Sequence, residues 1–245
     1  MAVAMTLVLG ACSEEDDPAA QPSTTTQVTP PKTTPASPSP PCAGEIASGD
    51  RLPGTLEGDV DGDGRVDEIY LVRSDAANAE CRTLLVVRAA GTTYAISTED
   101  PDMPSSLPQP RLNRLAHVDD EGGAEVLVDV EAGAATQFVA MFTIDGSDLV
   151  RVRLAGDAGL GDLFPYGGSV GHIEASNCPV DDSSDVVIAL ATPRGSRYLV
   201  ERTYYDLDDG TLVEVARDEE RLEVAALSRE HDYVTSPFGS CLVNP

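Results

Sequence analysis

The sequence predicts an all-β head domain, covering residues 42–245, in which one strand unit is repeated. Three observations support this fold class. An acidic loop occurs three times, with offsets of 58 and 60 residues, and each copy runs into a stretch of apolar, mostly β-branched residues. Two further strand-like stretches and a Gly turn follow each copy. Four-stranded units repeated radially form a partial or small β-propeller-like structure, and a β-sandwich is the alternative architecture.

The chain begins with an apolar leader, residues 1–11 (MAVAMTLVLGA). It is shorter than the ~20 residues that a membrane-spanning helix needs, and it ends in small residues, as an export signal does. The tetrad Leu9-Gly10-Ala11-Cys12 resembles the lipobox of bacterial lipoproteins, although no Lys or Arg precedes the apolar stretch. The resemblance implies a lipid on Cys12 and a lipid-anchored position on the outer side of the membrane. A cleaved signal with a chance cysteine is the alternative.

A linker, residues 12–41, separates this leader from the head. Between residues 13 and 41 it contains eight Pro and ten Ser or Thr. Such a segment has too few apolar side chains to form a core, so we expect it to be disordered. Its proline content predicts a semi-rigid spacer of up to ~90 Å.

The cysteines also indicate export. Five is an odd number, and a lipid on Cys12 leaves four that can pair: Cys42, Cys81, Cys178 and Cys241. Four cysteines allow three connectivities. The pairing Cys42–Cys81 and Cys178–Cys241 is preferred, because each bridge would then hold one end of the domain. Two disulfides predict an oxidising, extracytoplasmic location. Zinc is not expected, because the sequence has no CxxC motif.

The net charge of −26 restricts the possible partners. The linker has four acidic residues and Lys32, so −23 of the total belongs to the head. A domain this acidic repels phosphate backbones and anionic headgroups, which argues against a nucleic-acid partner. Cations and basic partners are favoured.

The first acidic loop, residues 59–67, has the spacing of a calcium loop. Carboxylates alternate at Asp59, Asp61, Asp63 and Asp67, and the carbonyl of Arg65 stands at position 7. Calcium prefers oxygen ligands spaced in this way, with a Gly at position 6. A helix–loop–helix site would need a Glu at position 12, where this chain has Leu71, so the loop belongs to a β protein. A solvated turn is the alternative interpretation.

The other two loops are degraded copies. Residues 117–125 keep Asp119, Glu121 and Glu125, but His117 replaces the first Asp. Since calcium binds imidazole nitrogen poorly, we expect a weak second metal loop there at most. Residues 177–185 keep Asp181 and Asp185 and have an amide at the first position.

Three strands are expected after each loop. The first strand of each unit is expected at residues 69–72, 126–130 and 186–190. The second is expected at residues 83–88, 137–144 and 198–205, and the third at residues 93–97, 149–154 and 212–216. Asp145-Gly146 and Asp209-Gly210 are typical hairpin turns. Residues 43–58 and 222–243 remain to complete the units.

The DxDxDGxxD loop before a strand, in units of about 60 residues, resembles the FG-GAP and VCBS repeats of extracellular β-propellers. Tyr166-Gly167-Gly168-Ser169-Val170 resembles the FG-x-S-V lead-in of those repeats. The resemblance implies that calcium is bound by Asp59, Asp61, Asp63, the Arg65 carbonyl and Asp67. It also implies ligand binding or adhesion more often than catalysis, and the partner would be an unknown envelope protein or glycan.

Two other functions are considered. The domain could be purely structural, an acidic fold that calcium stabilises, or it could be a cryptic envelope hydrolase. Residues 167–171 match the GxSxG nucleophile motif, but no strand–turn–helix pattern surrounds Ser169. The match is therefore interpreted as chance, and no catalytic residue is predicted. An Asp/Glu catalytic pair cannot be identified in so acidic a sequence.

Overall fold

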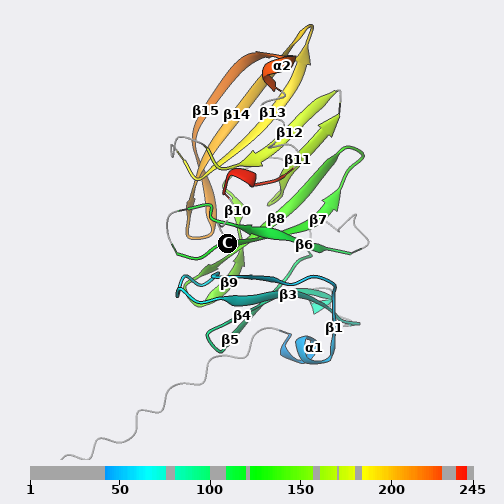
Figure 1. Ribbon diagram of the computed structural model, residues 1–245, viewed down its shortest axis with the longest axis vertical. Helices are drawn as coiled ribbons and strands as arrows, with labels where there is room; N and C mark the ends of the chain where they lie inside the picture. The colour runs from blue at the N-terminus through cyan, green and yellow to red at the C-terminus, as the bar shows by residue number, and fades with distance from the viewer. Residues whose placement is uncertain are drawn as a thin grey trace, which may run out of the picture. The chain divides into compact units, whose positions relative to one another are not determined.

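The computed structural model describes residues 42–75, 81–99, 109–119, 122–156, 161–169, 171–179, 184–227 and 236–241. Strands dominate these residues, which confirms the all-β fold class (Figure 1). The described helices are short: α1 (Ala43–Ser48), α2 (Val224–Leu227) and the 3₁₀ helix η2 (Gly239–Cys241). The predicted signal peptide, Cys12 and the linker lie outside the described residues.

The first sheet contains the strands that flank the first acidic loop. Its members are β1 (Asp50–Arg51), β2 (Leu56–Gly58), β3 (Asp67–Arg73), β4 (Thr83–Ala89) and β5 (Thr92–Ser97). The pairs β2–β3, β3–β4 and β4–β5 are all antiparallel. This gives a four-stranded meander, with the acidic loop between its first and second strands.

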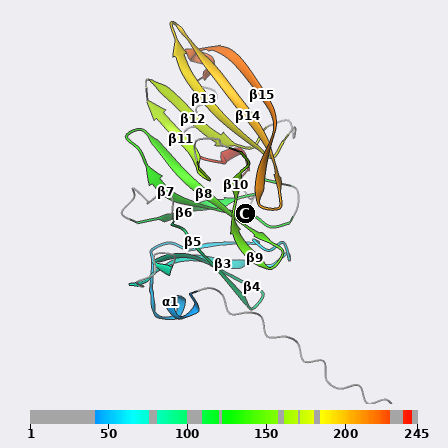
Figure 2. The same cartoon turned by 180° about the vertical axis from the view of Figure 1, so that it is seen from behind.

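The second sheet contains two meanders with the same pairing. One is β6 (Arg111–Ala116), β7 (Glu125–Ala132), β8 (Thr136–Asp145) and β9 (Asp148–Arg151). The other is β12 (His172–Asn177), β13 (Val186–Arg194), β14 (Arg197–Asp208) and β15 (Thr211–Glu223). In each, the acidic loop again connects the first strand to the second. Eight of the nine predicted strand segments are therefore strands or parts of strands (Figures 1 and 2). The predicted strand 149–154 is instead divided at Val152 between β9 and β10 (Arg153–Leu154), which pair with different strands.

Two shorter strands join these meanders. β11 (Phe164–Ser169) pairs with both β8 and β12, and β10 (Arg153–Leu154) pairs in parallel with the beginning of β15. The strand order is β10-β15-β14-β13-β12-β11-β8-β7-β6. Neither sheet closes on itself within the described residues, so the structure is an open, two-sheet all-β fold.

Strands β7 and β8 have apolar side chains on both faces. Val126, Val128 and Phe142 pack into a core shared with the first sheet. Leu127 and Met141 point the other way, into a second core that contains Phe164 and Leu212. Successive side chains of a strand point to opposite faces, so a continuous apolar stretch such as 126–128 is what a strand buried on both sides requires.

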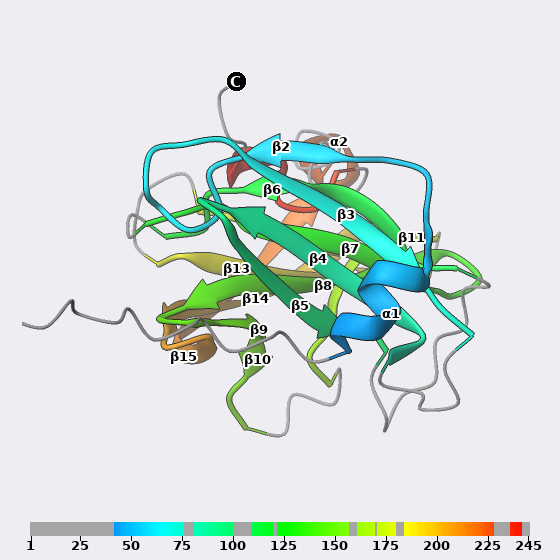
Figure 3. The same ribbon diagram turned by 90° about the horizontal axis from the view of Figure 1, so that it is seen from below.

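Disulfides hold both ends of the domain, in the pairing that the sequence favours. Cys42–Cys81 fixes the segment before α1 to the chain entering β4, and Cys178–Cys241 fixes η2 to the end of β12. Helix α1 covers the outer face of the first sheet (Figure 3), where Ile46 packs against an apolar cluster. Disulfides of this kind are typical of oxidising, extracellular surroundings. No helix of the described residues is long and apolar enough to cross a membrane.

Candidate metal centre

The first acidic loop folds around its own carboxylates. Gly62 and Gly64 adopt φ values of +72° and +79°, which are readily accessible only to glycine. The turn that they allow brings the Gly64 N–H to Asp59 Oδ2 at 2.8 Å. Asp61 Oδ1 accepts from the Asp63 N–H at 3.2 Å, and Asp63 Oδ1 accepts from the Arg65 N–H at 2.8 Å. The backbone N–H groups thus orient the carboxylates of positions 1, 3 and 5.

Asp67 closes the loop from the first residue of β3. Its side chain is buried, and its Oδ2 accepts hydrogen bonds from the N–H groups of Val60 at 2.8 Å and Asp61 at 3.3 Å. The Asp67 side chain is therefore held against the backbone of Val60 and Asp61, and its other oxygen, Oδ1, is available to another partner.

Three carboxylates of the loop come together. Oxygens of Asp59, Asp61 and Asp67 lie within 4.8 Å of one another. Oxygens on opposite sides of one calcium ion are about 5 Å apart, twice the Ca–O distance, so this group is compact enough to share an ion. Oδ1 of Asp59 and Oδ1 of Asp67 are both buried and have no hydrogen-bond partner among the described residues. The donor set is thus hard, anionic and incompletely satisfied, as a calcium site requires.

The two remaining predicted ligands are placed differently. Asp63 is outside the group of three, and its Oδ2 lies 3.9 Å from the Arg65 guanidinium in an exposed contact. The side chain of Arg65 is largely in solvent, and the prediction concerns its carbonyl. The structure therefore assembles three of the five sequence-predicted ligand residues directly around one point, and the roles of Asp63 and the Arg65 carbonyl stay predictions.

The electrostatics of the loop favour a cation. Burial raises the pKa of Asp67, and the charges of Asp61 and Asp59 raise it further, while the N–H groups of Val60 and Asp61 lower it. Several carboxylates this close repel one another unless a proton or a positive ion lies between them. A divalent ion would offset both the burial and the repulsion.

The second loop reproduces part of this geometry. Glu125, its ninth residue, begins β7 and accepts a hydrogen bond from the Val118 N–H at 2.9 Å, as Asp67 does from Val60. Burial, the largest effect, raises the pKa of Glu125 to about 8, and Asp119 contributes in the same direction. Glu121 lies outside the described residues, so the weak second site stays a prediction.

The first two loops are in direct contact. The Ala124 N–H donates to the Asp59 carbonyl at 2.8 Å. A Cβ placed on Gly123 would lie 2.0 Å from the Val60 carbonyl oxygen, and one on Gly62 would lie 3.0 Å from the backbone of Gly122. The close approach depends on the glycines of both loops.

The third loop uses its polar residues differently. Asn177 is buried, and its Oδ1 accepts from the Ser240 N–H at 2.8 Å, which holds η2 in place. Asp185 Oδ2 accepts from the Leu207 N–H at 2.7 Å on β14. Asp181 lies outside the described residues. Asn177 and Asp185 thus serve the packing of strands and termini.

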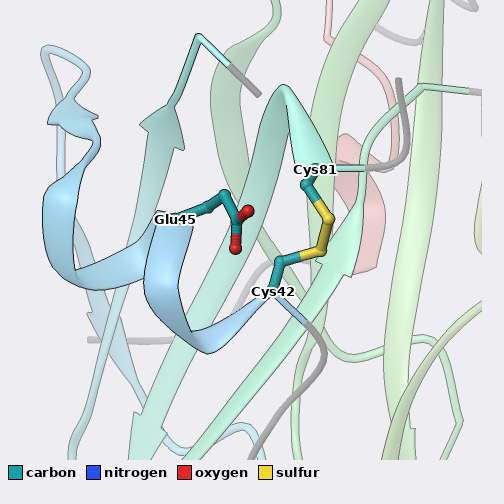
Figure 4. A group of neighbouring side chains, drawn as sticks. All are labelled: Cys42, Glu45 and Cys81. Carbon is teal, nitrogen blue, oxygen red and sulfur yellow. A yellow bond between two sulfur atoms is a disulfide. The ribbon is translucent and has the colours of Figure 1, made fainter. Parts of the chain in front are cut away.

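A second close group consists of Cys42, Glu45 and Cys81 (Figure 4). Its sulfurs are bonded to each other, so neither is a thiolate that could bind a metal. The expectation that these cysteines form a disulfide and not a zinc site agrees with this geometry.

The GxSxG match lies in a β-hairpin. Ser169 ends β11, and β12 follows two residues later, where a nucleophile elbow would need a helix. A Cβ on Gly168 would lie 2.5 Å from the His172 carbonyl oxygen, and one on Gly167 would lie 2.9 Å from the Ala135 carbonyl oxygen. The glycines are explained by close backbone packing.

Sequence reasoning missed one polar cluster beside this hairpin. His172 Nε2 lies 3.1 Å from Thr136 Oγ1 and 3.5 Å from Glu174 Oε2. Thr136 also donates to Glu174 at 2.6 Å. The side chains meet across Gly167, which pairs with both Thr136 and Glu174 and has no side chain. The His-x-Glu spacing on one strand face is the signal that could have found two members.

Comparisons with known proteins give no relatives: no protein family, no curated protein and no solved structure matches this chain.

Proposed function

We propose that this chain is a lipid-anchored, extracytoplasmic calcium-binding module that binds a protein or glycan at the cell envelope. One observation carries the calcium assignment. Asp59 and Asp67 each keep one buried oxygen without a hydrogen-bond partner among the described residues, beside a carboxylate of Asp61. Leaving such oxygens unpaired is costly, and a hard divalent cation is the partner that an all-carboxylate group selects.

The ion would cross-link the two ends of the loop between β2 and β3. Asp59 follows β2 and Asp67 begins β3, so one cation would join the first two strands of the first meander. Through the Asp59 carbonyl, the same loop is joined to Ala124, just before β7. Calcium would therefore stabilise the packing of the first sheet on the second. These contacts also favour the purely structural alternative, in which calcium has no other role.

The repeated pairing supports the interpretation of the head as FG-GAP/VCBS-like units. Each meander has its acidic loop between strands one and two, and only the first loop keeps the full set of carboxylates. In this interpretation the units are blades of a partial, open propeller. The second and third loops would have exchanged metal ligation for packing contacts.

The disulfides and the apolar leader support the proposed location. Two disulfides are typical of an oxidising compartment, and LGAC at the end of an apolar leader supports lipidation of Cys12. Detergent phase partition tests the anchor. The expressed full-length protein should enter the detergent phase and Cys12→Ala should not. A wild-type protein that stays in the aqueous phase would contradict the lipid assignment.

A calcium titration of the head tests the metal site. The melting temperature should rise with calcium and return with EDTA, because binding to the folded state adds about 2.7 kcal/mol at 100 times Kd. Asp67→Asn and Asp59→Asn should abolish the rise. Glu57→Gln is the matched control, since it removes an exposed carboxylate of neighbouring β2 and should leave the rise intact. If neither calcium nor EDTA changes the melting temperature of the wild-type head, the loop is a solvated turn.

Capture of envelope partners on the immobilised head, with calcium or with EDTA, separates the binding role from the structural one. We expect captured protein or glycan that is released by EDTA. If the head captures no partner but its melting temperature still rises with calcium, the purely structural role is supported.

A further inference from the structure

The strand β15 has a long free edge. It is thirteen residues long, and β10 pairs only with its first two residues, Thr211 and Leu212, on the side away from β14. No other described strand lies beside the remaining eleven, residues 213–223, which we name the β15 edge. At about 3.3 Å per residue the edge is roughly 36 Å long. Both views show β15 along the margin of its sheet (Figures 1 and 2).

The beginning of β15, immediately before this edge, already pairs with a strand on the same side. The Arg153 N–H donates to the Gly210 carbonyl at 3.0 Å, and the Ala155 N–H donates to the Leu212 carbonyl at 2.9 Å. The twist and position of β15 are therefore compatible with an added strand. The register of β15 shifts at Val215, and beyond this irregularity the backbone N–H and C=O groups of residues 216–223 offer a regular ladder to another chain.

The surface of the edge is charged and open. Residues 213–221 are all exposed, including the apolar Val213 and Val215. β15 has five acidic residues and two arginines, a net charge of −3. Four of these acidic residues, Glu214, Asp218, Glu220 and Glu223, already form ion pairs with Arg217, Arg202 or Arg197. Glu219 lies directly opposite Glu201 of β14, and neither carboxylate has an ion-pair partner among the described residues. Like charges on facing residues repel, so this pair would gain from a positive charge on an added strand.

The charge and conformation of the β15 edge indicate which kind of chain would pair with it. A second copy of β15 would bring another net charge of −3 against the edge, and the head as a whole is strongly acidic, so self-pairing is disfavoured. An extended segment with Lys or Arg at alternate positions has the opposite charge and the required conformation.

We propose that the β15 edge binds an extended, basic segment of a partner protein by adding it to the sheet as a further strand. The backbone ladder would supply affinity, and the unpaired charges of Glu219 and Glu201 would select a basic residue. This inference names the partner class for the binding role proposed above. It does not depend on calcium in the loop 59–67.

The test uses three synthetic decapeptides with alternating residues: Lys-Thr repeats, the same peptide N-methylated at every second residue, and Glu-Thr repeats. We expect the Lys-Thr peptide to bind the head and to protect amides of residues 213–223 from hydrogen exchange. N-methylation removes the donors of the added ladder, and the Glu-Thr peptide has the wrong charge, so both should bind at least ten-fold more weakly.

Two variants make the test specific. Glu219→Lys reverses one edge charge without breaking an ion pair and should weaken Lys-Thr binding by about three-fold, while Glu57→Lys, the same change on β2, should not. The proposal would be overturned if the N-methylated peptide bound as tightly as the unmodified one. It would also be overturned if the amides protected from hydrogen exchange lay outside β15. Dimerisation through β15 in analytical ultracentrifugation would overturn it as well.

Running every arm in calcium and in EDTA keeps the two proposals apart. Binding to β15 that persists in a head without a calcium response would leave this inference standing and remove the metal site. A calcium response without peptide binding would support the metal site and overturn the inference about the β15 edge.

Discussion

Gly123 and Val60 lie in loops that connect strands of different sheets, yet a Cβ on Gly123 would lie 2.0 Å from the Val60 carbonyl oxygen. The first and second acidic loops are thus packed backbone to backbone. Gly123 precedes Glu125 by two residues, and Val60 follows Asp59, so the contact joins two sites that the sequence presents as separate copies.

Gly123→Ala should destabilise the head, because the added methyl group collides with backbone that cannot rotate away. Overpacking of this kind costs about 1–3 kcal/mol, and each kcal/mol lowers the melting temperature by about 2–4 °C in a domain of this size. Differential scanning calorimetry in EDTA measures the loss, and a calcium titration should show weaker binding. Gly44→Ala is the control, since its Cβ would meet nothing within 4 Å. Equal melting temperatures for the two variants would refute the contact.

The stability of the head should depend on the protonation of Glu125. Its folded-state pKa is about 8, against an ordinary value of 4.5, so between these pH values the folded state holds a proton that the unfolded chain has released. The free energy of unfolding therefore falls as pH rises through this window, by at most about 1.4 kcal/mol per pH unit from this group.

Glu125→Gln keeps an acceptor for the Val118 N–H and removes the titration. The difference in urea midpoint between this variant and the wild type, measured in EDTA from pH 4.5 to 8.5, should grow in favour of glutamine. A constant difference across the range would mean that Glu125 is ionised throughout. If adding calcium reverses the trend, the second loop binds the ion.

Each disulfide should contribute about 4 kcal/mol through the entropy of the unfolded chain. The bridges join residues 39 and 63 apart, and the dependence on loop length is logarithmic, so the two contributions should differ by roughly 0.4 kcal/mol. Urea unfolding of the paired variants Cys42→Ala/Cys81→Ala and Cys178→Ala/Cys241→Ala measures both. A gap above about 2 kcal/mol would show that local packing outweighs chain entropy.

Ser169 should not react as a hydrolase nucleophile. Its Oγ accepts a hydrogen bond from the Gly171 N–H at 3.2 Å, and the serine ends a strand that is followed by another strand. A fluorophosphonate probe labels a serine whose hydroxyl is activated by a neighbouring base. Labelling should not exceed that of heat-denatured protein. Specific labelling that is lost in Ser169→Ala would instead support the envelope hydrolase.

The sequence predicts the strands well because their patterns are local. Residues 69–72 are apolar, and three of the four are β-branched or aromatic, while Asp209-Gly210 makes the turn between β14 and β15. The spacing within the loop 59–67 likewise identifies Asp59, Asp61 and Asp67, because their convergence depends on nearby glycines. The pairing of the cysteines follows from their positions at the two ends of the domain.

The parts that sequence reasoning misses depend on contacts between distant segments. The packing of Gly123 on Val60, and of Thr136 beside Glu174 across Gly167, joins positions that no local pattern relates. The apolar residues of 219–227 have no periodicity that decides between strand and helix, and the chain forms both there: β15 continues to Glu223, and α2 begins at Val224. The open ends of the sheets also depend on the arrangement of whole strands.

The two-sided burial of β7 makes both cores depend on one strand. Leu127 belongs to one core and Val126 to the other, so neither core keeps its full set of contacts if this strand is lost. The described head would therefore not divide into two halves that each keep an intact core. Damage to either core would also remove packing contacts from the other.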